Sequence, residues 1–358
     1  MNNPVTHRVA AVIPCFKVRA HILPLVAGIG PEVDAIICVD DACPEGSGDF
    51  IRDNCNDPRL RVITHAENQG VGGAVLTGFR DALQQGCDIA VKLDGDGQMD
   101  PRLLPQFVEP IAHSRADYTK GNRFFSPQSL ADMPRGRLLG NAVLSFVSKF
   151  STGYWDVFDP TNGYLAIDLR LLPFMETQKI ARRYFFETDM LFRLNLLSAR
   201  VVDIPMRAIY ADEVSNLSFS KEASRFARGH SKNFLKRIWY NYFLRNFSVA
   251  SLELVVGTAL LLSGIVYALL NYGGAEPASP GTVTVASMLF LVGILLLLSF
   301  LNFDIRRTPS TPIASLLPKA TQEHDAFELA ETGGVGTSGA DPNSVPAGAG
   351  PDANPITT

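Results

Sequence analysis

The chain has 358 residues, of which 46% are hydrophobic, 19% charged and 9% aromatic. This composition excludes a disordered or collagen-like protein and leaves room for one or two domains with a hydrophobic core. The 32 basic and 36 acidic residues give a net charge of −4. That balance argues against a nucleic-acid-binding protein, because such a protein needs surplus lysine and arginine along the phosphates.

Cysteine usage and the N-terminus indicate a reducing compartment. The five cysteines lie in the first quarter of the chain and form no CxxC pair, so we expect neither a disulfide framework nor a zinc site. We interpret them as reduced residues of the core or of loops. The first residues, MNNPVTHRVAAVIPCF, lack a basic start followed by a long apolar run, so no signal peptide is expected and the N-terminal region is predicted to be cytosolic.

Residues 1–220 alternate strand-like and helix-like segments. The predicted strands cover 8–14, 35–41, 61–65 and 88–97, and helical patterns run to Gly28, over 71–85 and onward from Pro101. This alternation predicts an α/β domain whose mainly parallel sheet is covered on both faces. Ligands bind beyond the carboxyl ends of the strands in such sheets.

Polar or turn-forming residues follow each of the four predicted strands. They are Pro14, Asp40 and Asp41, the 68–73 segment, and the 94–98 segment. Because the carboxyl ends of parallel strands meet at one edge of a sheet, these residues are expected to line one site.

The acidic turn LDGDGQMDP closes the fourth predicted strand. Asp94, Asp96 and Gln98 alternate with glycines, a spacing that can present oxygen atoms to Mg²⁺ or Mn²⁺ bound to a nucleotide diphosphate. An EF-hand loop is excluded because Met99 replaces its glycine and Pro105 stands where its bidentate glutamate belongs. A plain solvated turn is the remaining alternative.

A glycine-rich segment, ENQGVGGA, follows the third predicted strand and opens a helix. Helix N-termini with free N–H groups suit phosphate oxygens, so Gly72 is a candidate for binding the phosphates of a nucleotide ligand. The segment is not a P-loop, because no GK[ST] follows. As a dinucleotide fingerprint it is imperfect, because Val75 stands where the last glycine should be.

Two apolar segments near the C-terminus predict membrane spans. Residues 249–270 carry one charged side chain, Glu253, and residues 282–303 carry none. Each is long enough for a bilayer core of ~30 Å, which needs about 20 helical residues. Basic residues precede the first segment and follow the second, so the positive-inside rule places both outer ends in the cytoplasm. A buried helical hairpin of a soluble domain is the alternative.

The segments that flank the spans have different predicted roles. Residues 221–247 interleave basic and aromatic side chains, which is typical of amphipathic helices in the lipid headgroup layer, although an ordinary surface helix has the same pattern. Residues 305–358 are rich in Gly, Pro, Ala and Ser and are expected to form a disordered cytoplasmic tail. The predicted division of the chain is 1–220, 221–247, 248–304 and 305–358.

Six motifs occur in the order seen in family 2 glycosyltransferases with a GT-A fold: VIPCFKV, VDDACPEGSG, NQGVGGAVLTGFRDAL, KLDGDGQMDP, KGNRF and DPTNGYLAI. The chain most resembles the branch of dolichyl- or polyprenyl-phosphate sugar synthases, over residues 8–215 and in its paired spans. The resemblance implies a GT-A-type, Rossmann-like sheet domain followed by an interfacial amphipathic helix and two transmembrane helices.

The resemblance also implies roles on the nucleotide side. Pro14, Asp40 and Asp41 would line the base and ribose pocket, Asp94 would face the nucleotide, and Asp96 and Gln98 would bind the metal. Family members often carry a basic stretch after the last core strand, where this chain has Asp212 and Glu213.

Other motif residues are implied to bind the acceptor. Arg123 of KGNRF matches an arginine that contacts the acceptor phosphate, and Arg137 and Asn141 of RGRLLGN stand at positions used for the same purpose. The family has Ser where this chain has Asn141. Asp159 of DPTNGY matches a carboxylate on the acceptor side, which either orients the acceptor or acts as a base. A turn-forming Asp159 and a surface salt bridge of Arg123 are the structural alternatives.

Another pair of acidic residues stays open between two interpretations. Glu187 and Asp189 begin a predicted helix, where acidic residues favour the macrodipole, so they are either a structural cap or part of the acceptor site.

These observations together predict an inverting, metal-dependent transferase that moves a sugar from a nucleotide donor to polyprenyl phosphate. UDP-sugars are favoured over GDP-sugars by the range of family members. The alternatives are a membrane polysaccharide synthase of the same fold, a non-catalytic nucleotide-binding scaffold and a dinucleotide oxidoreductase. The predicted location is the bacterial inner membrane or its equivalent, with both termini and the active site in the cytoplasm. The sequence leaves the choice between monomer and homo-oligomer open.

Overall fold

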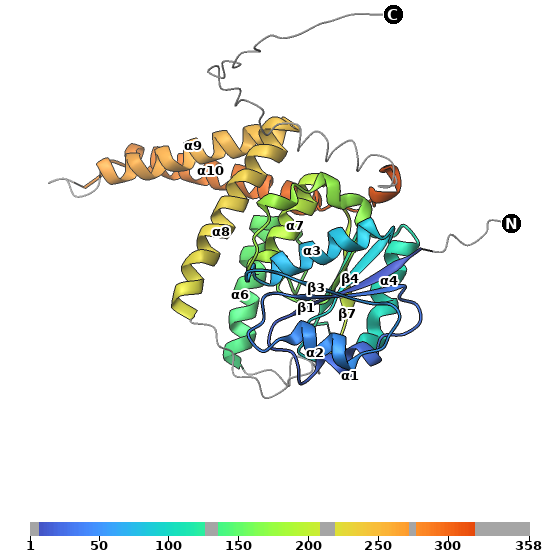
Figure 1. The fold of residues 1–358 in the computed structure, drawn as a ribbon. Helices are drawn as coiled ribbons and strands as arrows, with labels where there is room; N and C mark the ends of the chain where they lie inside the picture. Colours follow the sequence, from blue (N-terminus) through green and yellow to red (C-terminus); the bar gives the residue numbers. More distant parts are fainter. Residues whose placement is uncertain (1–6, 126–134, 208–218, 272–276, 319–358) are drawn as a thin grey trace, which may run out of the picture. The chain divides into compact units, whose positions relative to one another are not determined.

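A computed structural model describes residues 7–125, 135–207, 219–271 and 277–318 (Figure 1). Within this part of the chain, seven strands form one sheet: β1 (Val9–Cys15), β2 (Ala35–Asp40), β3 (Leu60–Thr64), β4 (Ile89–Lys92), β5 (Tyr118–Asn122), β6 (Leu165–Asp168) and β7 (Val201–Pro205). Their order is β3-β2-β1-β4-β6-β5-β7. Strand β6 is antiparallel to β4 and β5, and the other pairings are parallel. The predicted mainly parallel α/β sheet is confirmed.

Helices separate most of these strands. They are α1 (Ile22–Ala27), α2 (Ser47–Asn54), α3 (Val71–Gln84), α4 (Leu104–Ala112), α6 (Arg135–Thr152), α7 (Phe186–Leu197), α8 (Phe219–Trp239), α9 (Val249–Leu270) and α10 (Pro280–Arg306). The strand predicted over 88–97 ends earlier, at Lys92, because the glycine-containing turn leaves the ladder; Gly97 has a φ of +78°.

The sheet is buried on both faces, as the apolar strands require. On one face, Ile13 and Ile36 belong to a core that includes Ile22 of α1 and Phe107 of α4. Helix α3 packs so closely on the other face that a Cβ on Gly78 would lie 2.3 Å from Val12 Cγ1. Figure 1 shows α3 on one side of the sheet, with α1 and α2 on the other.

Helices α9 and α10 form an antiparallel hairpin with close backbone packing. A Cβ on Gly293 of α10 would lie 2.6 Å from the backbone nitrogen of Leu261 in α9. Both helices are long and apolar enough to cross a membrane, and only 22% and 11% of their apolar windows are buried. The hairpin therefore differs from a buried core hairpin within the described part of the chain.

Helix α8 and the π-helical turn after it, Tyr240–Leu244, occupy the predicted interfacial segment. One face is buried and contains His230, Asn233 and Arg237. Arg237 is therefore not one of the basic side chains available to a lipid headgroup layer, because its guanidinium forms an ion pair with Asp304 at 2.6 Å. Exposed basic side chains remain on the opposite face: Arg225, Arg228, Lys232 and Lys236.

The segment predicted as a disordered tail begins within ordered structure. Helix α10 continues to Arg306, and the backbone N–H groups of Ile313 and Ala314 donate to the carboxylate of Asp117 at 2.9 and 2.7 Å. Asp117 is buried and needs hydrogen-bond donors, which explains why the chain is held here. Residues 319–358 lie outside the described residues.

Candidate active site

The strand register brings the predicted nucleotide-side residues to one edge of the sheet. Pro14 is opposite Val39, and Cys15 is opposite Asp40, at the carboxyl ends of β1 and β2. Strand β4 pairs with β1 in parallel, so the acidic turn after Lys92 leaves the sheet at the same edge. The strand ends therefore meet at one edge of the sheet, as predicted.

Asp40 is buried and holds the turn before α2. Its Oδ1 accepts the N–H of Cys43 at 2.7 Å, and its Oδ2 accepts the N–H of Gly48 at 2.5 Å. Only glycine fits at position 48, because a Cβ there would lie 2.7 Å from Asp40 Oδ2. The structure therefore gives Asp40 a turn-forming role, and its contact with the nucleotide base stays a prediction.

Asp41 has the same kind of role in the next turn. It accepts the N–H groups of Gln69 and Gly70 at 2.8 and 2.7 Å, and His65 Nδ1 lies 2.8 Å from its Oδ1. Asp41 thus fastens the end of β2 to the glycine-rich turn before α3. Its predicted contact with the ribose or base is likewise untested by this geometry.

The glycines at the start of α3 serve packing. The N–H groups of Gly72 and Gly73 donate to the carbonyl of Arg182 at 2.8 and 3.3 Å, and a Cβ on Gly72 would lie 2.7 Å from the carbonyl oxygen of Ala181. The expectation of a free N–H on Gly72 for phosphate binding is therefore wrong. The physical reason is that the segment before α7 approaches α3 so closely that a side chain would clash.

Asp94 begins the acidic turn, and its negative charge is neutralised by Lys92 at the end of β4. The Nζ of Lys92 lies 2.8 Å from Asp94 Oδ1 and 3.2 Å from Glu187 Oε1. Burial alone would lower the pKa of Lys92, but the two carboxylates raise that pKa above its ordinary value. The lysine stays charged and holds Asp94 at the edge of the sheet.

Asp96 and Gln98 are half-buried, and the N–H of Gln98 donates to Asp96 Oδ1 at 3.0 Å. Among the described residues, no group of three or more His, Cys, Asp or Glu side chains could hold a metal ion. The oxygen donors of this turn nevertheless fit Mg²⁺ or Mn²⁺, which take one or two protein carboxylates and complete their shell with substrate phosphates. The donor set suits a cation that binds together with a diphosphate.

Gly163 of the DPTNGY motif links the acidic turn to the acceptor-side motif. A Cβ at this position would lie 2.2 Å from Asp94 Oδ2 and 2.6 Å from Lys92 Nζ. The next residue, Tyr164, donates its hydroxyl to the carbonyl of Asp100 at 3.2 Å. Two motifs far apart in the sequence are therefore in direct contact, and a side chain at position 163 would have to displace Asp94 or Lys92.

Arg123 and Asp159 form a bidentate ion pair on the acceptor side. Arg123 Nε donates to Asp159 Oδ2 at 2.7 Å and Nη2 donates to Oδ1 at 3.0 Å. Asp159 is 1% exposed, whereas the Arg123 side chain is 26% exposed. The pair is thus no surface salt bridge, and whether Asp159 orients the acceptor or acts as a base stays a prediction.

Helix α6 carries the other two predicted acceptor residues. Asn141 is half-buried in its second turn, and the side chain of Arg137 lies outside the described residues. The helix contacts the loop that carries Asp159, because Ser145 Oγ donates to the carbonyl of Phe158 at 2.7 Å. The residues Asp212 and Glu213, singled out in the sequence, also lie outside the described residues.

Sequence reasoning missed Lys92 and Lys120 and left Glu187 undecided. Lys120 is fully buried, donates to the carbonyl of Asn162 at 2.6 Å, and has a pKa lowered to about 8 by burial. Glu187 joins Lys92 in the cluster behind Asp94, whereas Asp189 is structural, because it accepts the N–H of Ala181 at 2.8 Å. A lysine within an otherwise buried strand was the available signal.

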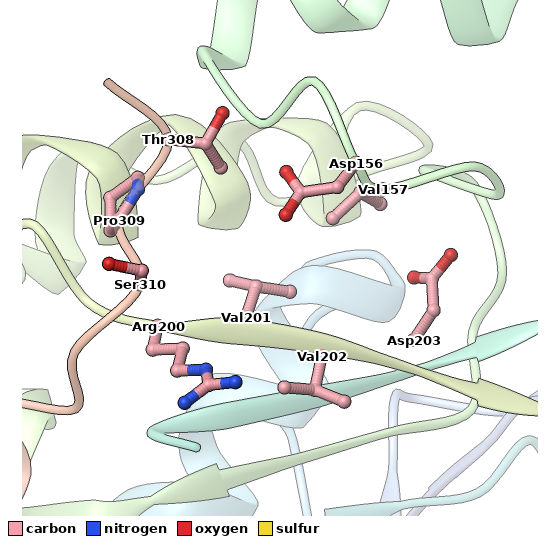
Figure 2. A pocket seen from close by; sticks show the side chains of 9 residues that line it. All are labelled: Asp156, Val157, Arg200, Val201, Val202, Asp203, Thr308, Pro309 and Ser310. Carbon is pink, nitrogen blue, oxygen red and sulfur yellow. The ribbon is translucent and has the colours of Figure 1, made fainter. Parts of the chain in front are cut away.

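Two cavities border the described residues. The first, of about 220 Å³, lies along β7, where the 308–310 segment faces Asp156 (Figure 2). Burial raises the pKa of Asp203, which lines this cavity, to about 6. The second, of about 450 Å³, lies between α8 and the segment before α7, and its lining residues are Ala181, Arg182, Arg183, Tyr184, Phe185, Arg225 and Phe226.

Comparison with known proteins gives the family. Residues 10–173 match the model of glycosyl transferase family 2. An undecaprenyl-phosphate mannosyltransferase of Micrococcus luteus is 32% identical over 205 residues, which cover 56% of this chain and 82% of that protein. A UDP-N-acetylglucosamine–dolichyl-phosphate N-acetylglucosaminyltransferase of Methanococcus voltae is 28% identical over 215 residues, which cover 56% and 85%.

A solved structure shares the fold. Mannosyl-3-phosphoglycerate synthase from Rubrobacter xylanophilus gives a TM-score of 0.50 at 16% identity, covering 68% of this chain and 77% of that one. Glucosyl-3-phosphoglycerate synthase from Mycobacterium tuberculosis, in complex with Mn²⁺ and UDP, gives a TM-score of 0.46 at 20% identity, covering 64% and 80%. With its GT-A-like sheet, the chain belongs to glycosyltransferase family 2 and is related to the polyprenyl- and dolichyl-phosphate sugar transferases.

Proposed function

We propose that this enzyme is an inverting, metal-dependent glycosyltransferase that moves a sugar from a nucleotide donor to a polyprenyl phosphate at the cytoplasmic face of a membrane. The observation that carries the proposal is the contact of Gly163 with Asp94, because it joins the nucleotide side of the site to the loop that bears Asp159. The relatives named for undecaprenyl and dolichyl phosphate support the same acceptor class.

On the nucleotide side, Asp96 and Gln98 are the residues that would hold Mg²⁺ or Mn²⁺. When bound, such a cation neutralises the charge that develops on the departing nucleotide diphosphate. Asp94, already paired with Lys92, stands beside this position and orients the nucleotide. Asp40 and Asp41 keep the two flanking turns in place through backbone hydrogen bonds, so the pocket is formed before the nucleotide arrives.

On the acceptor side, Arg123 contributes the positive charge of its guanidinium to the acceptor phosphate, and Arg137 and Asn141 add contacts from α6. Asp159 fixes the Arg123 guanidinium in one orientation. A phosphate monoester is already an anion at neutral pH, so it attacks the anomeric carbon without a protein base. The attack comes from the face opposite the departing diphosphate, which inverts the configuration of the sugar.

The C-terminal elements suit an acceptor that resides in a membrane. The hairpin of α9 and α10 exposes an apolar surface, and exposed Trp239, Leu244 and Phe247 lie between the basic face of α8 and the start of α9. Such a surface is typical of a protein that enters the bilayer from the headgroup layer. We place both outer ends of the hairpin in the cytoplasm, where nucleotide sugars are made.

The test is transfer by the purified full-length protein with undecaprenyl phosphate, Mn²⁺ and a panel of labelled UDP- and GDP-sugars. We expect one sugar to appear on the lipid, with UDP-sugars favoured, and product formation to stop when the cation is chelated. Asp96→Ala should lower the rate by about 10³-fold, because a charge-neutralising group is lost. The exposed Asp49→Ala is the matched control.

Three outcomes would contradict the proposal. If no nucleotide sugar gives a lipid-linked product, polyprenyl phosphate is not the acceptor. If Asp96→Ala keeps full activity, Asp96 does not hold a catalytic metal ion. Products with long sugar chains would indicate a polysaccharide synthase of the same fold.

A further inference from the structure

A buried carboxylate at the end of α10 receives hydrogen bonds from three other parts of the chain. Asp304 is 4% exposed and accepts Arg237 Nη1 and Nη2 at 2.6 and 3.0 Å, the Tyr242 hydroxyl at 2.7 Å and Trp155 Nε1 at 3.0 Å. These donors belong to α8, to the π-helical turn and to the loop after α6. All four bonds involve an ionised group, which makes them stronger than neutral ones.

The hydrogen-bond donors of Arg237, the cation of this cluster, also have buried acceptors. Arg237 is buried, and its Nε and Nη2 donate to the carbonyl of Phe150 at 3.1 and 2.8 Å in addition to the bonds to Asp304. A buried ion pair is favourable only when both partners have good geometry and further hydrogen bonds. The cluster meets that condition, so it joins α6, α8 and α10 rigidly.

The cluster leads directly to the acceptor side of the site. Trp155 stands four residues before Asp159 in the loop after α6. Within this loop, the N–H of Phe158 donates to Asp203 at 3.0 Å, and the Phe158 carbonyl accepts Ser145 Oγ at 2.7 Å. The 155–159 loop is therefore held at both ends, at one end by Asp304 and at the other by the pair of Asp159 with Arg123.

A second attachment follows the end of α10. Ile313 and Ala314 donate their N–H groups to Asp117, the residue before β5. The other end of β5 is followed by Arg123. The end of the apolar hairpin is thus connected to both chain segments that supply the Arg123–Asp159 pair.

We propose that Asp304 is a positioning residue that sets the depth of the Arg123–Asp159 pair relative to the membrane. The inference rests on the proposed function, because the phosphate of a membrane-embedded acceptor is held at a fixed depth. A misplacement of about 1 Å can cost about 10²-fold in rate. A short-chain acceptor diffuses in water and can reach the site at its changed depth, so the rate of transfer to it should not fall.

The experiment compares undecaprenyl phosphate with geranyl phosphate as acceptors for the full-length protein in phospholipid vesicles. For Asp304→Asn we expect kcat/KM with undecaprenyl phosphate to fall at least about tenfold, and kcat/KM with geranyl phosphate to stay within about twofold. The KM for the nucleotide sugar should not change. Trp155→Phe removes the indole N–H that donates to Asp304 but keeps an aromatic side chain. This variant can be tested in the same way if Asp304→Asn fails to fold.

A second readout does not depend on transfer. Amide hydrogen exchange over 155–159 should be faster in Asp304→Asn and in Trp155→Phe, and unchanged in Asn302→Ala, a control at an exposed position of the same helix. Equal losses with both acceptors, or unchanged exchange over 155–159, would overturn the positioning role. A wild-type protein that transfers sugar to neither acceptor would instead refute the proposed function, and the exchange result would still decide whether Asp304 restrains the loop.

Discussion

The two halves of the site hold their charged side chains in different ways. In the nucleotide half, formed by β1 to β4 and the turns at their carboxyl ends, Asp40 and Asp41 accept backbone N–H groups. In the acceptor half, formed by β5 to β7, α6 and the 153–164 loop, the predicted site residues Arg123 and Asp159 pair with each other through their side chains.

The difference predicts different consequences of substitution. A carboxylate that satisfies backbone groups shapes a turn, so its loss destabilises the fold and the pocket together. A carboxylate that pairs with an arginine sets the orientation and charge of one functional group, so its loss or that of its partner changes chemistry more than folding. The Arg123–Asp159 pair also spans more sequence: its residues are 36 apart, whereas Asp41 is 28 and 29 residues from Gln69 and Gly70.

The largest effect on stability is expected for Asp41→Ala in the nucleotide half. The N–H groups of Gln69 and Gly70 lose their acceptor, so the free energy of unfolding should fall by about 3 kcal/mol and nucleotide binding should weaken. Denaturant titration in detergent and nucleotide titration measure the two quantities, with the exposed Asp53→Ala as control. If nucleotide binding is lost while stability is unchanged, Asp41 contacts the nucleotide directly. That result would contradict the structural role given to Asp41 in the nucleotide half.

A somewhat smaller loss is expected where the two halves meet. Gly163→Ala places a Cβ against Asp94 and Lys92, so stability should fall by about 2 kcal/mol and Asp94 should be displaced. Gly140→Ala is the matched control, because a Cβ there has no heavy atom within 4 Å and alanine favours a helix. Thermal unfolding compares the melting temperatures of the two variants. Equal melting temperatures would show that the two motifs do not pack closely at Gly163.

Arg123→Lys should change activity without changing the fold. Lysine keeps the charge but loses the bidentate geometry toward Asp159, so transfer should fall about tenfold, equivalent to about 1.4 kcal/mol. Steady-state kinetics with varied acceptor measure the loss, and Arg115→Lys, in an exposed pair with Glu109, serves as control. A large drop in melting temperature would show that this pair is as structural as Asp41.

An effect of opposite sign is expected at Asp203, which accepts hydrogen bonds from Asn122 and Phe158 in the acceptor half. Burial raises its pKa from 3.8 to about 6, so between these values the folded protein retains a proton that the unfolded chain releases. Stability therefore falls as pH rises through this window. Asp203→Asn should remove that dependence, so it should raise the free energy of unfolding at pH 7 and change it little at pH 4. Denaturant unfolding at both pH values checks this; a parallel pH dependence in both proteins would contradict it.

Local patterns were sufficient for much of the fold and for the nucleotide edge. The predicted span 249–270 has the same bounds as α9, and four strands lie within a few residues of their predicted positions, except where the turn shortens β4. An apolar run of strand or span length and the turn after it are short-range features, so periodicity reveals them. The side chains at the strand ends then converge because parallel strands share an edge.

Other features depend on partners far along the chain. No local pattern shows that Gly72 lies under the carbonyl of Arg182, or that the chain after Arg306 returns to Asp117. Lys92 stands out in an apolar strand, but no local pattern shows that its partner is Glu187, 95 residues further along the chain. Burial and pairing become visible only when the strands and helices are assembled.

The sequence by itself determined the family, the sheet, the acidic turn and the apolar hairpin, because each is carried by residues that are neighbours in the chain. Only the tertiary structure decided that Asp159 is committed to Arg123, and that Asp304 joins the hairpin to the acceptor loop. The physical reason is that a charge is removed from water only where folding supplies its partner, and these partners come from segments that meet only in the folded protein.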